Sequence, residues 1–303
     1  MVACDAGGQA DDGRLHVVAT TTQVGSIARE IGGDKVELTV LLQPGAEAHD
    51  YEMTPLAAAA VEEADIVLRS GAGLETWLDD ALETIGGADV TRDMSDGITL
   101  RESAEPEGDD HGDDEDHGDD EDHGAADPHY WLSAPNAVLM VENVEAALAS
   151  ADAANASTFA ERADGLSERL DAADAEIRAL MAEIPEEDRG IVTNHDALGY
   201  FIDEYGLRFV GSVFPNLDVA AEPAPGELAD LIETIQTERV AAIFSESAVS
   251  PGLASTVAAE TDAEVVDEPL YTDSLGPEGS GAETLDGMLL HNATVIHSAL
   301  SGS

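Results

Sequence analysis

Short apolar runs alternate with helical segments twice along this chain, and one long helical stretch separates the two sets. The strand-like runs lie at residues 15–22, 36–42 and 66–68 in the first set, and at residues 190–193, 208–210, 241–244 and 264–266 in the second. Strands that alternate with helices form parallel sheets covered by helices on both faces. The pattern therefore predicts an α/β protein with two lobes, each built on a parallel sheet.

The stretch between the two sets, residues 157–184, is regular and rich in Ala, Leu, Glu and Arg, which favour helices. With 303 residues, the chain is also longer than most single cores. We predict a disordered tether at residues 1–13, an N-terminal lobe at 14–156, a single connector helix at 157–186 and a C-terminal lobe at 187–303.

A low-complexity segment interrupts the N-terminal lobe. Residues 109–124 read DDHGDDEDHGDDEDHG, and we expect residues 102–126 to form an exposed, mobile loop because they cannot bury a core. The repeat makes His111, His117 and His123 candidate weak ligands for a metal, since a mobile loop would lose entropy on closing around an ion. A solubilising acidic linker without a metal role is the alternative.

The charge of the chain limits its partners. The formal net charge is −53, from 65 acidic and 12 basic residues, and Lys35 is the one lysine. Such a composition predicts a halophilic protein, kept soluble where salt screens its self-repulsion. A disordered acidic protein is the alternative, but the 43% of hydrophobic residues argue against it. We expect no binding to nucleic acid or to anionic lipid headgroups, because both carry the same sign of charge.

Cys4 is the one cysteine, so no intrachain disulfide is possible. Small residues precede it and a flexible polar stretch follows, as at the end of a lipoprotein signal peptide. We predict lipidation of Cys4, which would hold the protein at the outer face of the cell membrane; an ordinary cysteine in a frayed terminus is the alternative. No other stretch approaches 18 apolar residues, so the body is not expected to span a membrane.

Three histidines and one aspartate occupy unusual positions, mostly just after strand-like runs. They are His49, His129, His195 and Asp273. Loops beyond the carboxyl ends of parallel strands are where α/β sheets bind ligands. A single loop histidine would more often be structural, but two such residues from each predicted lobe form a pattern that indicates a site.

The segments around these residues resemble a known family. PGAEAHDYEMTP, DPHYWLSAPNA, TNHDALGYFIDEYGL, FSESAVSP and YTDSLGPEG, in this order, are similar to segments of the metal-binding substrate-binding proteins of ABC importers for zinc and manganese. The resemblance covers nearly the whole chain from Leu15 to the last helix. It implies two lobes joined by one rigid helix, with a metal in the cleft bound by His49, His129, His195 and Asp273.

The resemblance also implies an extracytoplasmic location and delivery of the metal to a membrane permease driven by ATPase subunits. Lipid anchoring is common in the family, which supports the prediction for Cys4. We expect a monomer that touches the membrane through its lipid anchor alone and whose lobes move little.

Three neutral imidazoles and one carboxylate make a site of net charge −1, suited to a borderline divalent cation. Zinc is favoured over manganese, because relatives tuned to manganese often carry a glutamate at the position of His195. Manganese is the alternative, since sites of this composition also occur in relatives that accept it. We expect the affinity to fall below about pH 6, as free histidines become protonated.

The second nitrogen of each ligating imidazole needs a neighbour that holds it. The nearby acids are candidates for this role, and their spacing does not rank them: Glu47, Asp50, Asp196 and Glu246. For each of them, an ordinary place on an acidic surface is the alternative.

Two other classes of protein fit the sequence less well. A zinc hydrolase would need an open coordination position and a general base, yet the chain has no His-Glu-x-x-His helix, nucleophile elbow or phosphate loop. Four protein ligands also leave no position for a reacting water, so we do not expect an enzyme. A surface adhesin would predict an exposed aromatic patch, but aromatic residues are only 4% of the chain.

Overall fold

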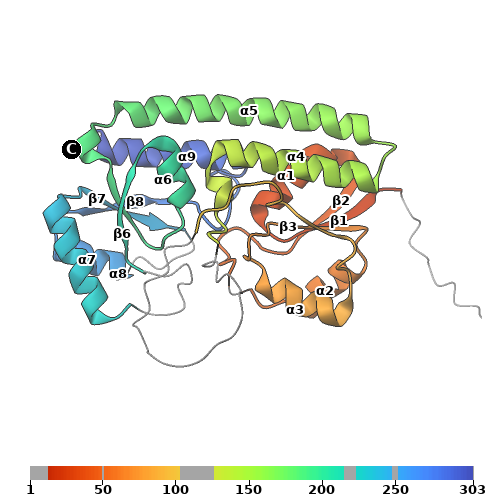
Figure 1. Cartoon of the computed structure of the whole chain (residues 1–303), viewed down its shortest axis with the longest axis horizontal. Helices are drawn as coiled ribbons and strands as arrows, with labels where there is room; N and C mark the ends of the chain where they lie inside the picture. The colour runs from red at the N-terminus through yellow and green to blue at the C-terminus, as the bar shows by residue number, and fades with distance from the viewer. Residues whose placement is uncertain (1–12, 50, 103–125, 215–222, 248–251, 303) are drawn as a thin grey trace, which may run out of the picture.

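The computed structural model describes residues 13–49, 51–102, 126–214, 223–247 and 252–302. Figure 1 shows two α/β lobes side by side, with one long helix running along both. Several sequence predictions lie outside the described residues: the tether before residue 13, Cys4, the acidic segment 103–125 and Asp50.

Each lobe contains one four-stranded parallel sheet. The N-terminal sheet has the order β2-β1-β3-β4, with β1 at Leu15–Ala19, β2 at Val36–Val40, β3 at Ile66–Arg69 and β4 at Thr91–Asp93. The C-terminal sheet has the order β6-β5-β7-β8, with β5 at Gly190–Thr193, β6 at Arg208–Ser212, β7 at Ala242–Glu246 and β8 at Glu264–Leu270. The predicted fold class is confirmed, although β4 was not predicted, because its three residues carry no apolar run.

Helices cover both faces of each sheet (Figure 1). In the N-terminal lobe they are α1 at Thr22–Gly32, α2 at Pro55–Glu62, α3 at Thr76–Ile85 and α4 at Ala134–Ala151. In the C-terminal lobe they are α6 at Gly199–Tyr205, α7 at Pro225–Glu238, α8 at Gly252–Ala259 and α9 at Leu285–Leu300. Alternation along β1 explains the layers: Val17 packs in the core with α1 and α4, whereas Val18 packs with α2 and α3.

The start of α2 follows from its sequence. Thr54 accepts a hydrogen bond from the backbone N–H of Ala57 (3.1 Å), and Pro55 fills the first helical position. A threonine cap satisfies a backbone donor that the helix leaves free, and a proline there loses no helical hydrogen bond.

The connector is helix α5, at Ala156–Glu183. Its buried residues recur at helical spacing along one face, at Phe159, Ala163, Leu166, Leu170, Ala173, Ile177 and Met181. This face packs on α4 and α9, and the hydrophobic core beneath it is continuous from β1 of the first lobe to Phe244 of the second. The two lobes therefore share one core, which resists their separation.

Three arginines fasten α5 to both lobes. Arg162 donates to the backbone carbonyls of Ile31 (3.1 Å) and Gly32 (2.7 Å) at the end of α1. Arg169 pairs with Glu30 of α1 and with Asp286 of α9, and Arg178 pairs with Glu204 of α6. Exposed pairs of this kind add little stability each, so their main effect is to orient the helix.

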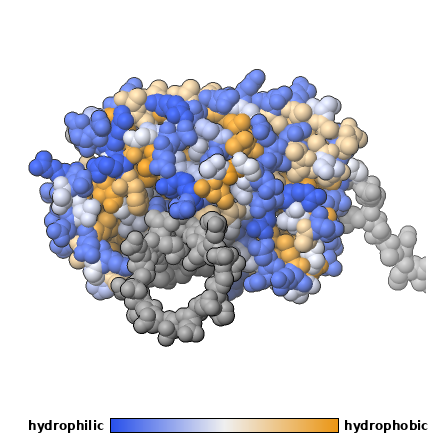
Figure 2. Space-filling model, viewed as in Figure 1, coloured by the Kyte–Doolittle hydropathy of each residue, from blue (hydrophilic) through white to orange (hydrophobic). Residues whose placement is uncertain are grey.

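Most basic residues of the chain are paired with acids. Eight of the twelve lie within salt-bridge distance of a carboxylate among the described residues: Arg14, Lys35, Arg69, Arg101, Arg162, Arg169, Arg178 and Arg208. Figure 2 shows a face on which hydrophilic residues surround smaller apolar areas. The surplus of acids is thus left without compensating cations.

In the part of the chain that the structure describes, no helix has the length and apolar character needed to cross a bilayer.

Because the two lobes share one core beneath α5, we expect the loss of a large side chain from this core to destabilise the protein strongly. Phe159 is fully buried, whereas Phe209 on β6 is 38% exposed, which makes it a matched control. We expect Phe159→Ala to lower the free energy of unfolding by about 3–5 kcal/mol through the lost burial and the cavity left behind. Phe209→Ala should cost about 1 kcal/mol. Urea denaturation of both variants at one salt concentration measures the difference, and equal losses would contradict a core that depends on α5.

Candidate metal centre

Four side chains from distant segments converge where the two lobes meet. His49 follows β2, His129 precedes the short helix at Tyr130–Leu132, His195 follows β5 and Asp273 follows β8. One ligand atom from each lies within 4.8 Å of the corresponding atoms of the other three. The structure therefore brings together the four residues that the resemblance implied as ligands.

The separations within this cluster suit a small cation. His129 Nε2 lies 3.3 Å from His49 Nε2 and 3.2 Å from Asp273 Oδ1, and His195 Nε2 lies 3.6 Å from the same oxygen. A tetrahedron with roughly 2.0–2.1 Å from centre to ligand has edges of roughly 3.3 Å. His129, His195 and Asp273 are buried, while His49 is half-buried and forms the side nearest to solvent.

Asp127 fixes the ring of His129. One carboxylate oxygen lies 2.8 Å from His129 Nδ1 and also accepts the backbone N–H of His129 (3.0 Å). This contact leaves Nε2 to face the cluster. Sequence reasoning missed this role, although an aspartate that accepts the N–H two residues later is a recognised local pattern.

Glu246 plays the corresponding part for His195. One of its oxygens lies 2.7 Å from His195 Nδ1, and the other accepts the backbone N–H of His195 (2.9 Å). Thr272 also donates to this carboxylate (2.8 Å). The nomination of Glu246 thus agrees with its position against the ring of His195.

The other nominated acids have different surroundings. Glu47 accepts the backbone N–H of His49 (3.0 Å), so it shapes the loop that carries this histidine. Asp196 is half-buried, and burial together with the charge of Asp127 raises its pKa. The prediction for Asp50 concerns a residue outside the described part of the chain.

Residues of the N-terminal lobe hold the loop that carries Asp273. Gln23 and Trp131 both donate to the backbone carbonyl of Thr272, at 3.1 Å and 2.9 Å. Thr22 accepts the backbone N–H of Leu275 (2.8 Å), and the backbone N–H of Gly45 donates to Ser274 (2.8 Å). Asp273 belongs to the second lobe by chain order, but contacts with the first lobe set its position.

Charges around the cluster favour protons or a cation. Burial opposes charge on His129, but the carboxylates of Asp127 and Asp273 outweigh it and raise the pKa of His129 to about 9. Glu246 and Asp273 likewise raise the pKa of His195 well above its usual range, against the effect of burial. Burial would raise the pKa of Asp273, yet His195 and His129 hold it well below its usual range. Because these carboxylates raise the pKa of both rings in the metal-free protein, we expect protons to compete with the metal at a higher pH than free histidines would suggest.

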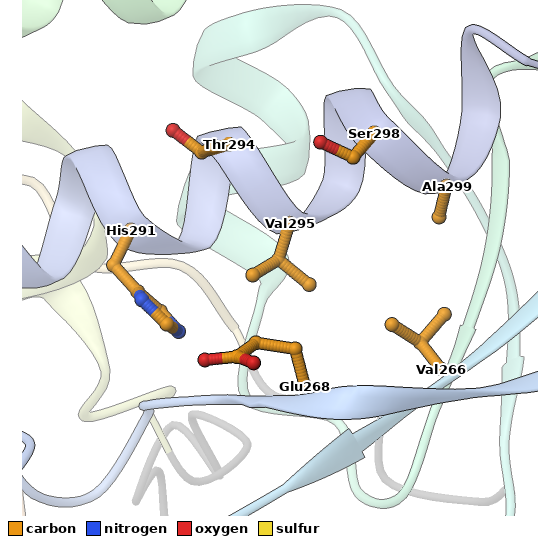
Figure 3. Close-up of a pocket in the computed structure, with 7 residues that line it drawn as sticks. All are labelled: Val266, Glu268, His291, Thr294, Val295, Ser298 and Ala299. Carbon is orange, nitrogen blue, oxygen red and sulfur yellow. The ribbon is translucent and has the colours of Figure 1, made fainter. Parts of the chain in front are cut away.

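The other histidines of the described residues, His16, His291 and His297, are not part of this cluster. His297 Nε2 lies 3.1 Å from Glu183, and His291 Nε2 lies 3.0 Å from the backbone carbonyl of Pro269. His291 lines a groove of about 470 Å³ between β8 and α9, where Glu268 is the other titratable group among the described lining residues (Figure 3). His291 and Glu268 together offer fewer ligands than the four-residue cluster between the lobes. His111, His117 and His123 lie outside the described residues.

Comparison with known proteins gives a family match over nearly the whole chain. The model of the family described as "Zinc-uptake complex component A periplasmic" matches residues 17–299.

Individual relatives carry the names of different metals. The manganese-binding lipoprotein MntA of Halalkalibacterium halodurans is 30% identical over 297 residues, which cover 97% of this chain and 91% of that protein. The zinc-binding lipoprotein AdcA of Streptococcus pneumoniae is 30% identical over 280 residues, covering 91% of this chain and 52% of its own length. The solved structure of the periplasmic zinc-binding protein TroA of Treponema pallidum superposes with a TM-score of 0.83 at 26% identity, covering 95% of this chain and all of that one.

The raised pKa of His129 predicts how the stability of the metal-free protein changes with pH. A pKa raised from 6.5 to about 9 adds stability that is complete below the unfolded-state pKa and is lost as the pH rises through about 9. We expect wild type to lose on the order of 3 kcal/mol more than His129→Gln over this interval. Urea denaturation at both ends of the interval, with a chelator present, measures the free energy of unfolding. Parallel curves for the two proteins would show that His129 is not charged in the metal-free state.

Proposed function

Since the chain belongs to the family of periplasmic zinc-uptake component A proteins, we propose that it captures a divalent transition metal outside the cytoplasm and delivers it to an ABC-type import permease. The metal is the cargo of this protein, and the permease with its ATPase subunits is the partner. Relatives named as metal-binding lipoproteins support this function, and one of them, MntA, is matched over 91% of its own length.

The observation that carries the proposal is the cluster of His49, His129, His195 and Asp273. Three imidazoles and a carboxylate offer four ligand atoms to one point, and two flanking carboxylates orient two of the rings. In the metal-free protein, protons on these rings balance the carboxylates, and a divalent cation can replace them.

We propose zinc as the cargo and manganese as the alternative. Nitrogen-rich, four-coordinate sites suit zinc, whereas manganese prefers more oxygen ligands. The relatives do not decide between them, because MntA is named for manganese and TroA for zinc.

Capture and release should involve local movement more than a wide opening of the lobes. The shared core under α5 and the hydrogen bonds from Gln23, Trp131 and Thr22 to the Asp273 loop oppose a large rotation. His49 is half-buried, whereas the other three residues of the cluster are buried. We propose that the metal enters and leaves past His49.

A second function, metal-dependent catalysis, has less support. All four ligand atoms come from the protein, so the site offers no evident position for a reacting water. We propose that the protein is not an enzyme. Lipidation at Cys4 and a place at the outer face of the membrane remain part of the proposal, in line with the lipoprotein names of the relatives.

Removal of a ligand tests the site directly. We expect His129→Ala and His195→Ala each to weaken zinc binding by about a hundredfold or more, because even the loss of an outer partner of a ligand costs 10–100-fold. His297→Ala is the matched control, since His297 pairs with Glu183 away from the site. Calorimetric titration with zinc, then competition with manganese, measures both affinity and preference. Unchanged affinity in both site variants would reject the proposed ligands.

Deletion of the repeat tests the proposed weak ligands His111, His117 and His123. We expect a protein without residues 109–124 to lose weakly bound zinc and to keep one tightly bound ion, because the tight ligands lie in other segments. Titration of both proteins with zinc counts the bound equivalents. Loss of the tight ion would assign that ion to the repeat.

A further inference from the structure

Arg101 links the metal site to the opposite lobe. It follows β4 in the N-terminal lobe, and its side chain is about one-third exposed. Its Nη1 donates to the carboxylate of Asp127 (3.0 Å), and its Nε donates to the carboxylate of Asp203 on α6 (2.8 Å). One guanidinium group thus joins the acid behind His129 to a helix of the second lobe.

Further contacts of Arg101 and Asp127, with each other and with Tyr200, strengthen the connection to α6. The backbone N–H of Asp127 donates to the carbonyl of Arg101 (2.9 Å). The hydroxyl of Tyr200, on α6, accepts from the backbone N–H of Arg101 (2.8 Å) and donates to the backbone carbonyl of Asp127 (2.8 Å). The guanidinium also lies 5.6 Å from the centre of the Tyr200 ring. Arg101 and Asp127 are therefore held as a unit against α6.

The first residue of α6 leaves room for this guanidinium. A Cβ atom on Gly199 would lie 1.6 Å from Arg101 Nη1 and 3.0 Å from Asp127 Oδ2. A larger residue at this position would displace the ion pair. Since Gly199 lacks a side chain, the helix can approach the Arg101–Asp127 pair directly.

We propose that Arg101 is a positioning residue of the metal site, which holds Asp127 against His129 only while α6 keeps its place. This inference rests on the proposed function, because it concerns how the same site retains its cargo. The two oxygens of Asp127 have separate partners, since Oδ1 faces His129 and Oδ2 faces Arg101.

The chemistry of the side chain fits this role. A guanidinium is planar and directs separate N–H groups at two carboxylates, whereas a lysine offers one compact charge. If α6 moved away, Arg101 would lose Asp203 and Tyr200 together. The carboxylate of Asp127 would then be less constrained, and so would the ring of His129. A shift of α6, for example when the protein docks on its permease, would thus loosen His129, a ligand from the first lobe.

The test measures metal release from the full chain. Arg101→Gln should release zinc about tenfold faster than wild type, at the lower end of what the loss of outer partners costs. The release rate of Arg101→Lys should fall between these two rates, because lysine keeps the positive charge but cannot direct separate N–H groups at two carboxylates. Arg208→Gln is the matched control, since Arg208 forms an exposed pair with Glu238 (3.0 Å). Stopped-flow transfer of zinc to a chromophoric chelator gives the rates.

Two further measurements separate positioning from general destabilisation. The visible absorption bands of bound Co²⁺ report ligand geometry and should shift in Arg101→Gln but not in Arg208→Gln. Asp203→Asn weakens only the ion pair with α6, keeps the contacts of Arg101 with Tyr200 and Asp127, and should speed zinc release about threefold, since an exposed partner contributes less.

Release from Arg101→Gln within twofold of wild type, or an unchanged Co²⁺ spectrum, would overturn the inference. Equal acceleration in Arg208→Gln would do the same. If wild type itself bound neither zinc nor Co²⁺ tightly, the proposed function would fail, and this outcome is distinct from those above.

Discussion

The continuous hydrophobic core beneath α5 is the constraint on which the rest of this structure depends. Because Phe159, Leu170 and Ile177 lie on one buried face that spans both lobes, the two sheets have a fixed separation. The carboxyl ends of β2, β5 and β8 are thereby held close enough for side chains from three loops to meet. Without this shared core, the two lobes could move independently, and the ligand side chains would not be kept together.

Within that frame, the buried acids organise the site. Asp127 and Glu246 face the outer nitrogens of His129 and His195, and Asp273 faces both inner nitrogens. Buried carboxylates are costly unless they are paired, and the rings of His129 and His195 each lie between two of these acids. The same pairing makes the site hold protons in the absence of metal, which links cargo binding to proton release.

Local sequence signals predicted most of the fold. Apolar runs revealed the strands other than β4, and the helix-favouring composition of residues 157–184 revealed α5, because such signals lie within short stretches of the chain. The short polar strand β4 gave no such signal. At the site, the resemblance supplied the four ligands, but not the acid behind His129. The contacts of Arg101 with α6, and of Gln23 with Thr272, join residues about 100 and 249 positions apart, so only the folded chain reveals them.

The pairing of most basic residues with acids has a consequence for how cargo arrives. Since eight of the twelve cations are neutralised by nearby carboxylates, little of the surface repels a divalent ion. The uncompensated acids create a negative potential around the whole molecule, which raises the local concentration of cations and the rate of their encounter. In concentrated salt this attraction is confined to a few ångströms. Under those conditions, selection of the cargo would depend on the imidazole nitrogens at the cleft and not on long-range attraction.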